Sequence, residues 1–221
     1  KSAKVSRVGR VMPCLSRIAI SSGAGVGLVA ATYAGTAPLK KHLLPLLRQL
    51  DGHLGAGGEV GRLTVVDSEV GTAGLMWALH DEADRIFITV VKGPVLAGAE
   101  IEPQGPWQAY RLRDELREVR VGLSGKGAPE DGIEVRGVQM RRPDSRRPVT
   151  TLFVTNSAPE EIPTEDVATA YLARWPLGEQ IFRDSRNGGG WNRSHGYGGE
   201  HVTHVALDTK LEHAERRVER A

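Results

Sequence analysis

Hydrophobic residues along the chain gather into short runs whose spacing predicts alternating strands and helices. The apolar run of residues 63–66 ends at Asp67, and the run of residues 85–91 ends before Lys92. Continuous runs of this length are typical of strands buried on both faces. Residues 73–81 lie between the runs and predict a helix. The order strand, helix, strand predicts a βαβ unit with parallel strands, in which Asp67 lies at the carboxyl end of the first.

The N-terminal part of the chain has a different pattern. Residues 17–21 and 26–33 predict two strands joined by a glycine-containing turn. Residues 38–50 carry apolar side chains at helical spacing and predict an amphipathic helix, with Pro45 inside it. The glycines of residues 23–27 would suit the nucleotide-binding loop of a small-molecule enzyme. That fingerprint requires a helix directly after the glycines, whereas the following residues here are β-like.

The middle of the chain predicts further β structure. Residues 94–106 are rich in glycine and proline and predict a loop, while residues 107–121 alternate in a way that either a helix or a strand would satisfy. Residues 133–142 and 149–156 predict a hairpin with a basic tip. Arg141 and Arg142, which precede this tip, are candidates for contacts with DNA phosphates, and simple surface solubility explains them equally well.

The stretch from residue 164 to 198 concentrates the candidate chemistry. Thr164 followed by two acidic residues predicts a helix N-terminus with Thr164 as the N-cap, and Pro176 predicts a kink or a second helix. On the second piece, Glu179, Arg183 and Arg186 recur at helical spacing and therefore share one face. A carboxylate beside two guanidinium groups can hold a metal ion and a phosphate together. An amphipathic helix with a solvated charged face is the alternative.

Composition limits the classes of protein that remain. The chain has 221 residues, which suits one domain or one domain with an insertion, and its net charge of +2 with a pI near 8.8 permits a nucleic-acid partner without requiring one. One cysteine, Cys14, excludes an internal disulfide, so a reducing cytoplasmic location is expected. No apolar run reaches the roughly 18 residues of a membrane span.

Four residues of the C-terminal stretch carry a family resemblance. Tyr171, Arg174, Glu179 and Arg186 resemble the tyrosine–arginine–glutamate–lysine signature of bacterial insertion-sequence transposases, with arginine in place of the lysine. These are Asp-Asp-Glu enzymes with an RNase H-like catalytic core. The passage from the run before Asp67 to Lys92 also resembles the second-aspartate region of that family.

The resemblance implies an α/β fold, in which an RNase H-like mixed sheet with flanking helices carries a β-rich insertion between the second aspartate and the glutamate. Asp67 and Glu179 are separated by 111 residues, which leaves room for such an insertion. The expected division has three parts. Residues 1–93 form the N-terminal part of the core, residues 94–160 the insertion, and residues 161–221 the helical part with the glutamate motif and the tail.

The resemblance also implies a mechanism and partners. Asp67 and Glu179 would hold Mg²⁺ or Mn²⁺ ions for phosphodiester cleavage and strand transfer in DNA transposition. The implied partner is the double-stranded DNA of transposon ends, bound as a homodimer in the nucleoid. The residues expected to contact this DNA are Tyr171, Arg174, Arg183, Arg186, Arg141 and Arg142.

One expected ligand has no counterpart in the sequence. The first aspartate of the family precedes the region that residues 1–35 resemble, and the first aspartate here is Asp51, in a predicted loop. The chain is therefore expected to be an N-terminally truncated or degenerate product with little or no catalytic activity. A non-catalytic DNA-binding remnant and a small-molecule α/β enzyme remain as alternatives, and Asp67 as a simple helix cap is the alternative to a catalytic Asp67.

Overall fold

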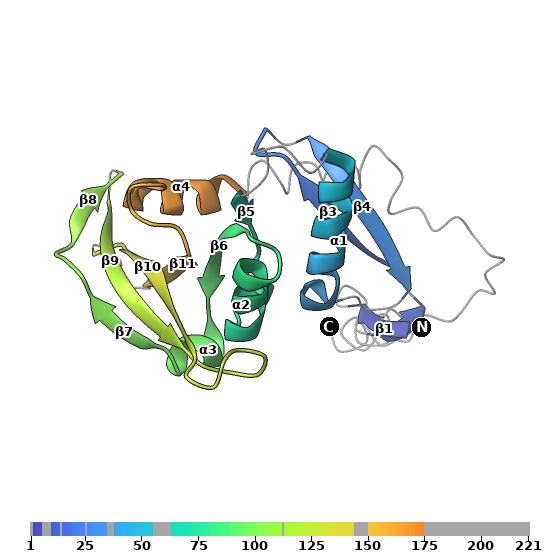
Figure 1. Cartoon of the computed structure of the whole chain (residues 1–221), viewed down its shortest axis with the longest axis horizontal. Helices are drawn as coiled ribbons and strands as arrows, with labels where there is room; N and C mark the ends of the chain where they lie inside the picture. The colour runs from blue at the N-terminus through green and yellow to red at the C-terminus, as the bar shows by residue number, and fades with distance from the viewer. Residues whose placement is uncertain are drawn as a thin grey trace, which may run out of the picture. The chain divides into compact units, whose positions relative to one another are not determined.

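The protein is a mixed α/β protein in which helices flank a mixed sheet (Figure 1). The computed structural model describes residues 2–5, 10–13, 15–24, 26–34, 38–54, 63–111, 113–143 and 150–174. All of these belong to one compact unit. The main sheet has seven strands in the order β5-β6-β11-β10-β9-β7, and β8 also pairs with β9. Its strands are β5 (Leu63–Val65), β6 (Ile86–Val91), β7 (Glu100–Pro103), β8 (Gln108–Tyr110), β9 (Asp114–Leu123), β10 (Ile133–Arg141) and β11 (Thr151–Thr155).

The predicted βαβ unit is confirmed. Strands β5 and β6 pair in parallel, and α2 (Ala73–Asp81) connects them after the short 3₁₀ turn η1 (Ser68–Val70). The neighbouring residues of β6 belong to two apolar clusters: Phe87 packs with α2, and Ile88 packs with α4 (Thr164–Arg174). Because both faces of this strand are covered, its sequence is almost continuously apolar.

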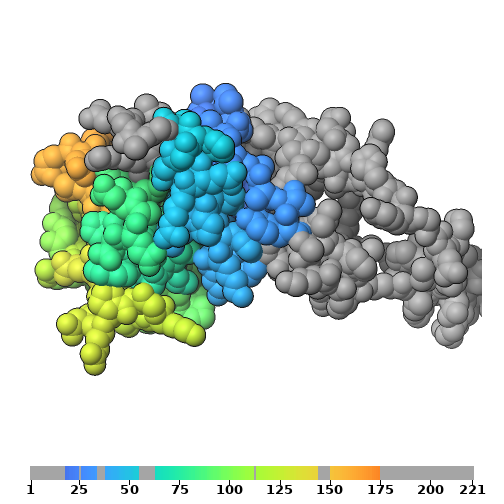
Figure 2. Space-filling view, turned by 45° about the vertical axis from the view of Figure 1, so that its right-hand side comes forward, coloured from blue at the N-terminus to red at the C-terminus, as the bar shows by residue number. Residues whose placement is uncertain are grey.

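The predicted N-terminal elements are confirmed, except that the predicted helix continues past residue 50, so Asp51 lies in it rather than in a loop. Strands β3 (Leu15–Ser21) and β4 (Gly27–Ala34) form an antiparallel hairpin, and α1 (Leu39–Leu54) follows with Pro45 inside it. A further strand pair precedes them, β1 (Ser2–Val5) with β2 (Arg10–Pro13). Leu43 and Leu47 of α1 join the apolar cluster that contains α2, and the backbone of Leu39 donates to Glu69 Oε1 at 2.9 Å. Figure 2 shows α1 in cyan against the green segment that contains η1 and α2.

The β-rich middle of the chain extends the same sheet. Strands β10 and β11 form the predicted antiparallel pair, and residues 107–121 fall mostly in β8 and β9 rather than in a helix. The loop predicted for residues 94–106 is wrong in part, because α3 (Gly93–Ala97) and β7 lie there. Pro94 lies in the first turn of α3, and Pro103 ends the edge strand β7. Proline and glycine therefore mark the ends of short elements here, where they are well tolerated.

The helix predicted from Thr164 is present as α4, but the predicted cap is wrong. The backbone N–H groups of Asp166 and Val167 donate to the carbonyl of Pro163, so the first turn begins one residue earlier. The hydroxyl of Thr164 instead donates to Glu118 Oε2 at 3.1 Å and accepts from Arg136 at 3.0 Å. Within the described part of the chain, no helix is both long and apolar enough to cross a membrane.

Candidate functional site

Asp67 lies just beyond the carboxyl end of β5 and begins η1. Its Oδ1 accepts the backbone N–H of Ser68 at 2.7 Å, so the carboxylate caps this turn. Its backbone carbonyl accepts the hydroxyl of Thr89 on β6 at 3.2 Å. The structure therefore confirms the capping role that was the alternative prediction for Asp67. Oδ2 makes no hydrogen bond within the described residues, and the side chain is 53% exposed, so it can still bind a ligand.

The last residue of α4 contacts this carboxylate. Arg174 Nη2 lies 3.3 Å from Asp67 Oδ1, although the two residues are 107 positions apart in the chain. The arginine side chain is 26% exposed, and its Nε is buried without a hydrogen-bond partner among the described residues. A cation at the C-terminus of a helix is also favoured by the helix dipole. The fold thus places a guanidinium group with unused donors beside Asp67.

Tyr171 lies one helical turn before Arg174 and is 9% exposed. Its ring packs against Phe153 at 5.4 Å between centroids, and the guanidinium carbon of Arg174 lies 5.1 Å from its ring centre. Burial raises the pKa of the Tyr171 phenol above its ordinary value of 10.0; the charge of Asp67 also raises it, while Arg174 opposes the shift. Tyr171 therefore stays protonated at neutral pH and can donate a hydrogen bond.

A polar network holds the other end of α4 on the sheet. Arg136 on β10 donates to the carbonyl of Ile162 at 2.7 Å and to the hydroxyl of Thr164, and its Nε pairs with Glu118 on β9 at 2.5 Å. Further along the helix, the hydroxyls of Tyr110 and Thr169 lie 2.9 Å apart. These contacts fix the helix that carries Tyr171 and Arg174.

The described part of the site supplies one carboxylate, one guanidinium and one phenol. No group of three or more histidine, cysteine, aspartate or glutamate side chains that could hold a metal ion occurs among the described residues. The remaining predicted members, Glu179, Arg183 and Arg186, lie outside the described residues. The predicted sharing of a metal ion by Asp67 and Glu179 therefore stays a prediction. Asp67 can supply one oxygen ligand to a hard cation such as Mg²⁺.

Arg141 and Arg142 are paired with carboxylates. Arg141 Nε lies 2.7 Å from Glu115 Oε2, and Arg142 makes two contacts with Asp114, at 2.8 and 3.1 Å. The hydrogen bond to Asp114, together with its charge, raises the pKa of Arg142. Glu115 is the register partner of Arg141 on β9, so strand pairing creates this contact. Their predicted role in DNA binding remains a prediction.

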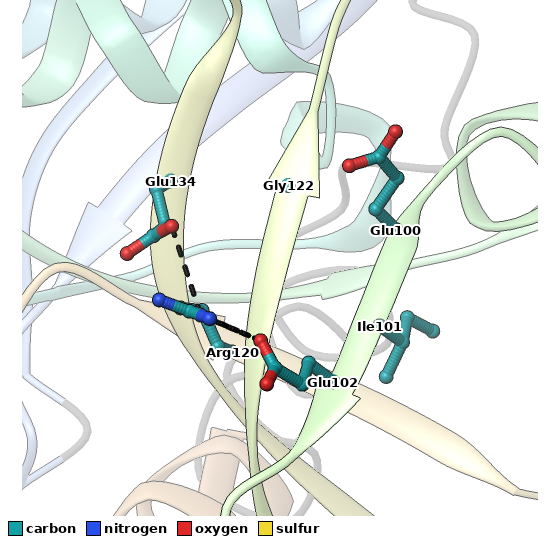
Figure 3. Close-up of a pocket in the computed structure, with 6 residues that line it drawn as sticks. All are labelled: Glu100, Ile101, Glu102, Arg120, Gly122 and Glu134. Atoms are coloured by element: carbon teal, nitrogen blue, oxygen red, sulfur yellow. Dashed lines mark hydrogen bonds and ion pairs between the residues drawn. The ribbon is translucent and has the colours of Figure 1, made fainter.

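A shallow hollow on the sheet lies away from Asp67 and carries more negative than positive charge. Figure 3 shows it on β7, β9 and β10, where Arg120 lies between Glu102 and Glu134 and is ion-paired to both. Its negative charge disfavours phosphate ligands. None of the predicted site residues lines it; the lining residues are Glu100, Ile101, Glu102, Arg120, Gly122 and Glu134.

Sequence reasoning missed the residues that position the site. Ser68 was not identified, although a serine after an aspartate at a strand end is a common turn signal. Glu118 and Arg136 carried no recognisable signal, because their pairing depends on the register of β9 and β10. Trp107 was likewise not singled out. Comparison of the chain with protein-family models and with curated proteins finds no match.

Proposed function

We propose that this chain is a transposase-like protein with an RNase H-like core that acts on DNA phosphodiesters with divalent metal ions. The observation that carries the proposal is the contact of 3.3 Å between Arg174 and Asp67. Asp67 and Arg174 belong to the two stretches that resemble transposases, and the fold brings them together from 107 positions apart.

Several features of the fold support an RNase H-like core. A hairpin, a helix, a strand ending in Asp67, a helix and a parallel strand follow one another in β3, β4, α1, β5, α2 and β6. The β-rich segment comes next, and the helix with Tyr171 and Arg174 follows it. Carboxyl ends of parallel strands are the usual place for active sites of such sheets.

Each described residue has a definite part in the proposed chemistry. Asp67 would offer Oδ2 to a divalent ion shared with Glu179, and such ions activate the attacking oxygen and stabilise the leaving oxygen of a phosphodiester. Arg174 would bind a phosphate next to the ion. Its side chain is 26% exposed, so its outer N–H groups are accessible to such a phosphate. Tyr171 would donate a hydrogen bond from its phenol to the DNA backbone.

Manganese titration of the 221-residue chain tests this proposal. Free Mn²⁺ is measured by electron paramagnetic resonance for the unaltered chain and for the variants Asp67→Asn and Glu179→Gln. We expect each variant to lose at least about tenfold in Mn²⁺ affinity, since removal of one charged oxygen ligand costs more than about 1.4 kcal/mol.

Glu134→Gln is the matched control, because Glu134 is an exposed carboxylate of the acidic hollow on the same sheet. It should bind Mn²⁺ like the unaltered chain. If Asp67→Asn and Glu179→Gln also bind Mn²⁺ like the unaltered chain, the two carboxylates do not share a metal site. The proposed metal-dependent chemistry is then wrong.

A non-catalytic DNA-binding protein of the same fold is the second candidate. One observation favours it: Ser68 and Arg174 both contact Oδ1 of Asp67, so half of this carboxylate already has partners. Under this alternative, Asp67 only stabilises the turn and α4. Asp67→Asn would then lower the thermal midpoint of unfolding, while Mn²⁺ affinity stays unchanged and duplex DNA binding persists.

A further inference from the structure

Five arginines gather where β8 turns into β9 and where β10 ends. We call them the arginine patch: Arg111, Arg113, Arg117, Arg141 and Arg142. Two carboxylates lie among them, Asp114 and Glu115, and each pairs with one arginine. The patch therefore keeps a clear excess of positive charge. Three of its members are not explained by the proposed metal site or by the predicted hairpin tip.

Trp107 holds two members of the patch in place. The guanidinium carbons of Arg117 and Arg141 lie 4.5 and 4.1 Å from the centre of its indole ring. Such cation–π contacts fix long side chains that would otherwise be mobile. Arg117 also donates from Nε and Nη2 to Gln139 Oε1, at 3.1 and 2.5 Å. Two guanidinium groups are thus preorganised, which lowers the entropy cost of binding a ligand.

Many donors of the patch stay available. Among the described residues, Arg141 uses only Nε in its pairing with Glu115, and Nη1 of Arg117 makes no hydrogen bond. Arg111 and Arg113 are exposed and make no hydrogen bond or ion pair with other described residues. Open guanidinium forks match the oxygens of a phosphate group in pairs. The patch offers several of them near one end of the sheet.

We propose that the arginine patch docks the phosphate backbone of duplex DNA, as a second contact besides the Asp67 site. This inference rests on the proposed function for the choice of DNA as the polyanion. A small phosphorylated ligand would require a concave site, and among the arginines of the patch none lines the hollow described above. A polymer with regularly repeated phosphates can engage several spread arginines at once, which a small ligand cannot.

The topology allows one duplex to reach both places. Strand β10 is three strands from β5 in the sheet order, which corresponds to about 14 Å at the usual strand spacing. Val91 at the end of β6 pairs with Leu152 near the start of β11, and Arg141 at the end of β10 pairs with Glu115 near the start of β9. The C-terminal ends of β6 and β10 therefore lie at the end of the sheet where the patch lies, and β5 runs parallel to β6. One turn of duplex is about 34 Å long and exceeds this separation.

Fluorescence anisotropy with a labelled duplex tests the patch. The affinity of the full 221-residue chain is measured between about 50 and 200 mM salt. The patch variant combines Arg111→Gln, Arg113→Gln and Arg141→Gln and keeps Arg117 with Trp107. Each lost phosphate contact should lower the slope of log affinity against log salt by about one, so the slope should fall by two to three units. We expect affinity to fall at least tenfold.

The control variant removes the same number of positive charges elsewhere, with Arg48→Gln, Arg120→Gln and Lys126→Gln. These side chains are exposed and lie outside the patch. The control should keep the slope of the unaltered chain, and both variants should keep its near-ultraviolet circular dichroism. If patch and control variants lose affinity equally, net charge alone explains binding and the patch is not a docking surface. The same conclusion follows if the unaltered chain does not bind duplex DNA, or prefers single strands or RNA.

The patch and the metal site can fail separately. Loss of DNA affinity in the patch variant, together with unchanged Mn²⁺ affinity in Asp67→Asn, would support the patch and overturn the metal-dependent function. Unchanged DNA affinity in the patch variant, together with lost Mn²⁺ affinity in Asp67→Asn, would overturn the patch alone. The two measurements share no altered residue.

Discussion

Arg136 anchors the helix that carries Tyr171 and Arg174, and its replacement by methionine should destabilise the protein strongly. The side chain is 10% exposed and makes three polar contacts, with Glu118, Ile162 and Thr164. Methionine fills most of the same volume but offers no donor. The variant Arg136→Met would leave the carboxylate of Glu118 and the carbonyl of Ile162 without this partner.

The size of the effect follows from burial. Removal of one partner from a buried ion pair costs about 3–5 kcal/mol. Glu118 is 30% exposed, so water recovers part of this loss and we expect about 2–3 kcal/mol. For a protein of this size, the thermal midpoint should fall by about 4–12 °C. The measurement is thermal and urea-induced unfolding followed by circular dichroism at neutral pH.

Arg120→Met is the matched control. Arg120 also lies on the sheet and pairs across strands with glutamates, but its side chain is 50% exposed and Glu102 is 60% exposed. An exposed pair contributes about 0–1 kcal/mol, so this variant should unfold almost like the unaltered chain. A double variant that adds Glu118→Gln to Arg136→Met should recover part of the lost stability, since it removes the unpaired charge. Equal losses for Arg136→Met and Arg120→Met would refute the reasoning.

Two further predictions concern a pair of helical glycines and one phenol. An added Cβ at Gly74 of α2 would lie 2.3 Å from the backbone oxygen of Lys126, so Gly74→Ala should lower the free energy of unfolding by about 1–3 kcal/mol despite the better helix propensity of alanine. At Gly52 of α1, no described atom lies within 4 Å of an added Cβ, so Gly52→Ala should raise the free energy of unfolding by about 0.5–1 kcal/mol. Urea denaturation measures both variants. Equal effects of the two substitutions would contradict the close packing at Gly74. Burial raises the pKa of Tyr171 above 10.0, so its stabilising contribution is complete below pH 10 and is lost as the pH rises through the higher value in the folded state. Tyrosinate absorbance should show one late-titrating group that is absent in Tyr171→Phe, and identical titration curves for the two proteins would show that burial does not hold this proton.

Local patterns were sufficient to predict most elements of the fold. The runs before Asp67 and Lys92 became β5 and β6, and the helices at residues 38–50 and 73–81 were found because their apolar side chains recur at fixed spacing. Residues 94–106 were predicted wrongly, because glycine and proline at the ends of short elements look like a loop when the pairing partner is unknown. Strand β7 exists through its pairing with β9, which no local pattern reveals.

The sequence by itself determined the parallel unit around Asp67, the β3–β4 and β10–β11 pairs and the presence of α4, since these depend on neighbouring residues. Only the tertiary structure decided that Arg174 contacts Asp67, that Glu118 and Arg136 hold α4, and that Trp107 orders two arginines. The physical reason is that such contacts depend on strand order and register, and a shift of one residue would turn each strand's side chains to the opposite face. That information is distributed over the whole sheet and cannot be read from a single segment.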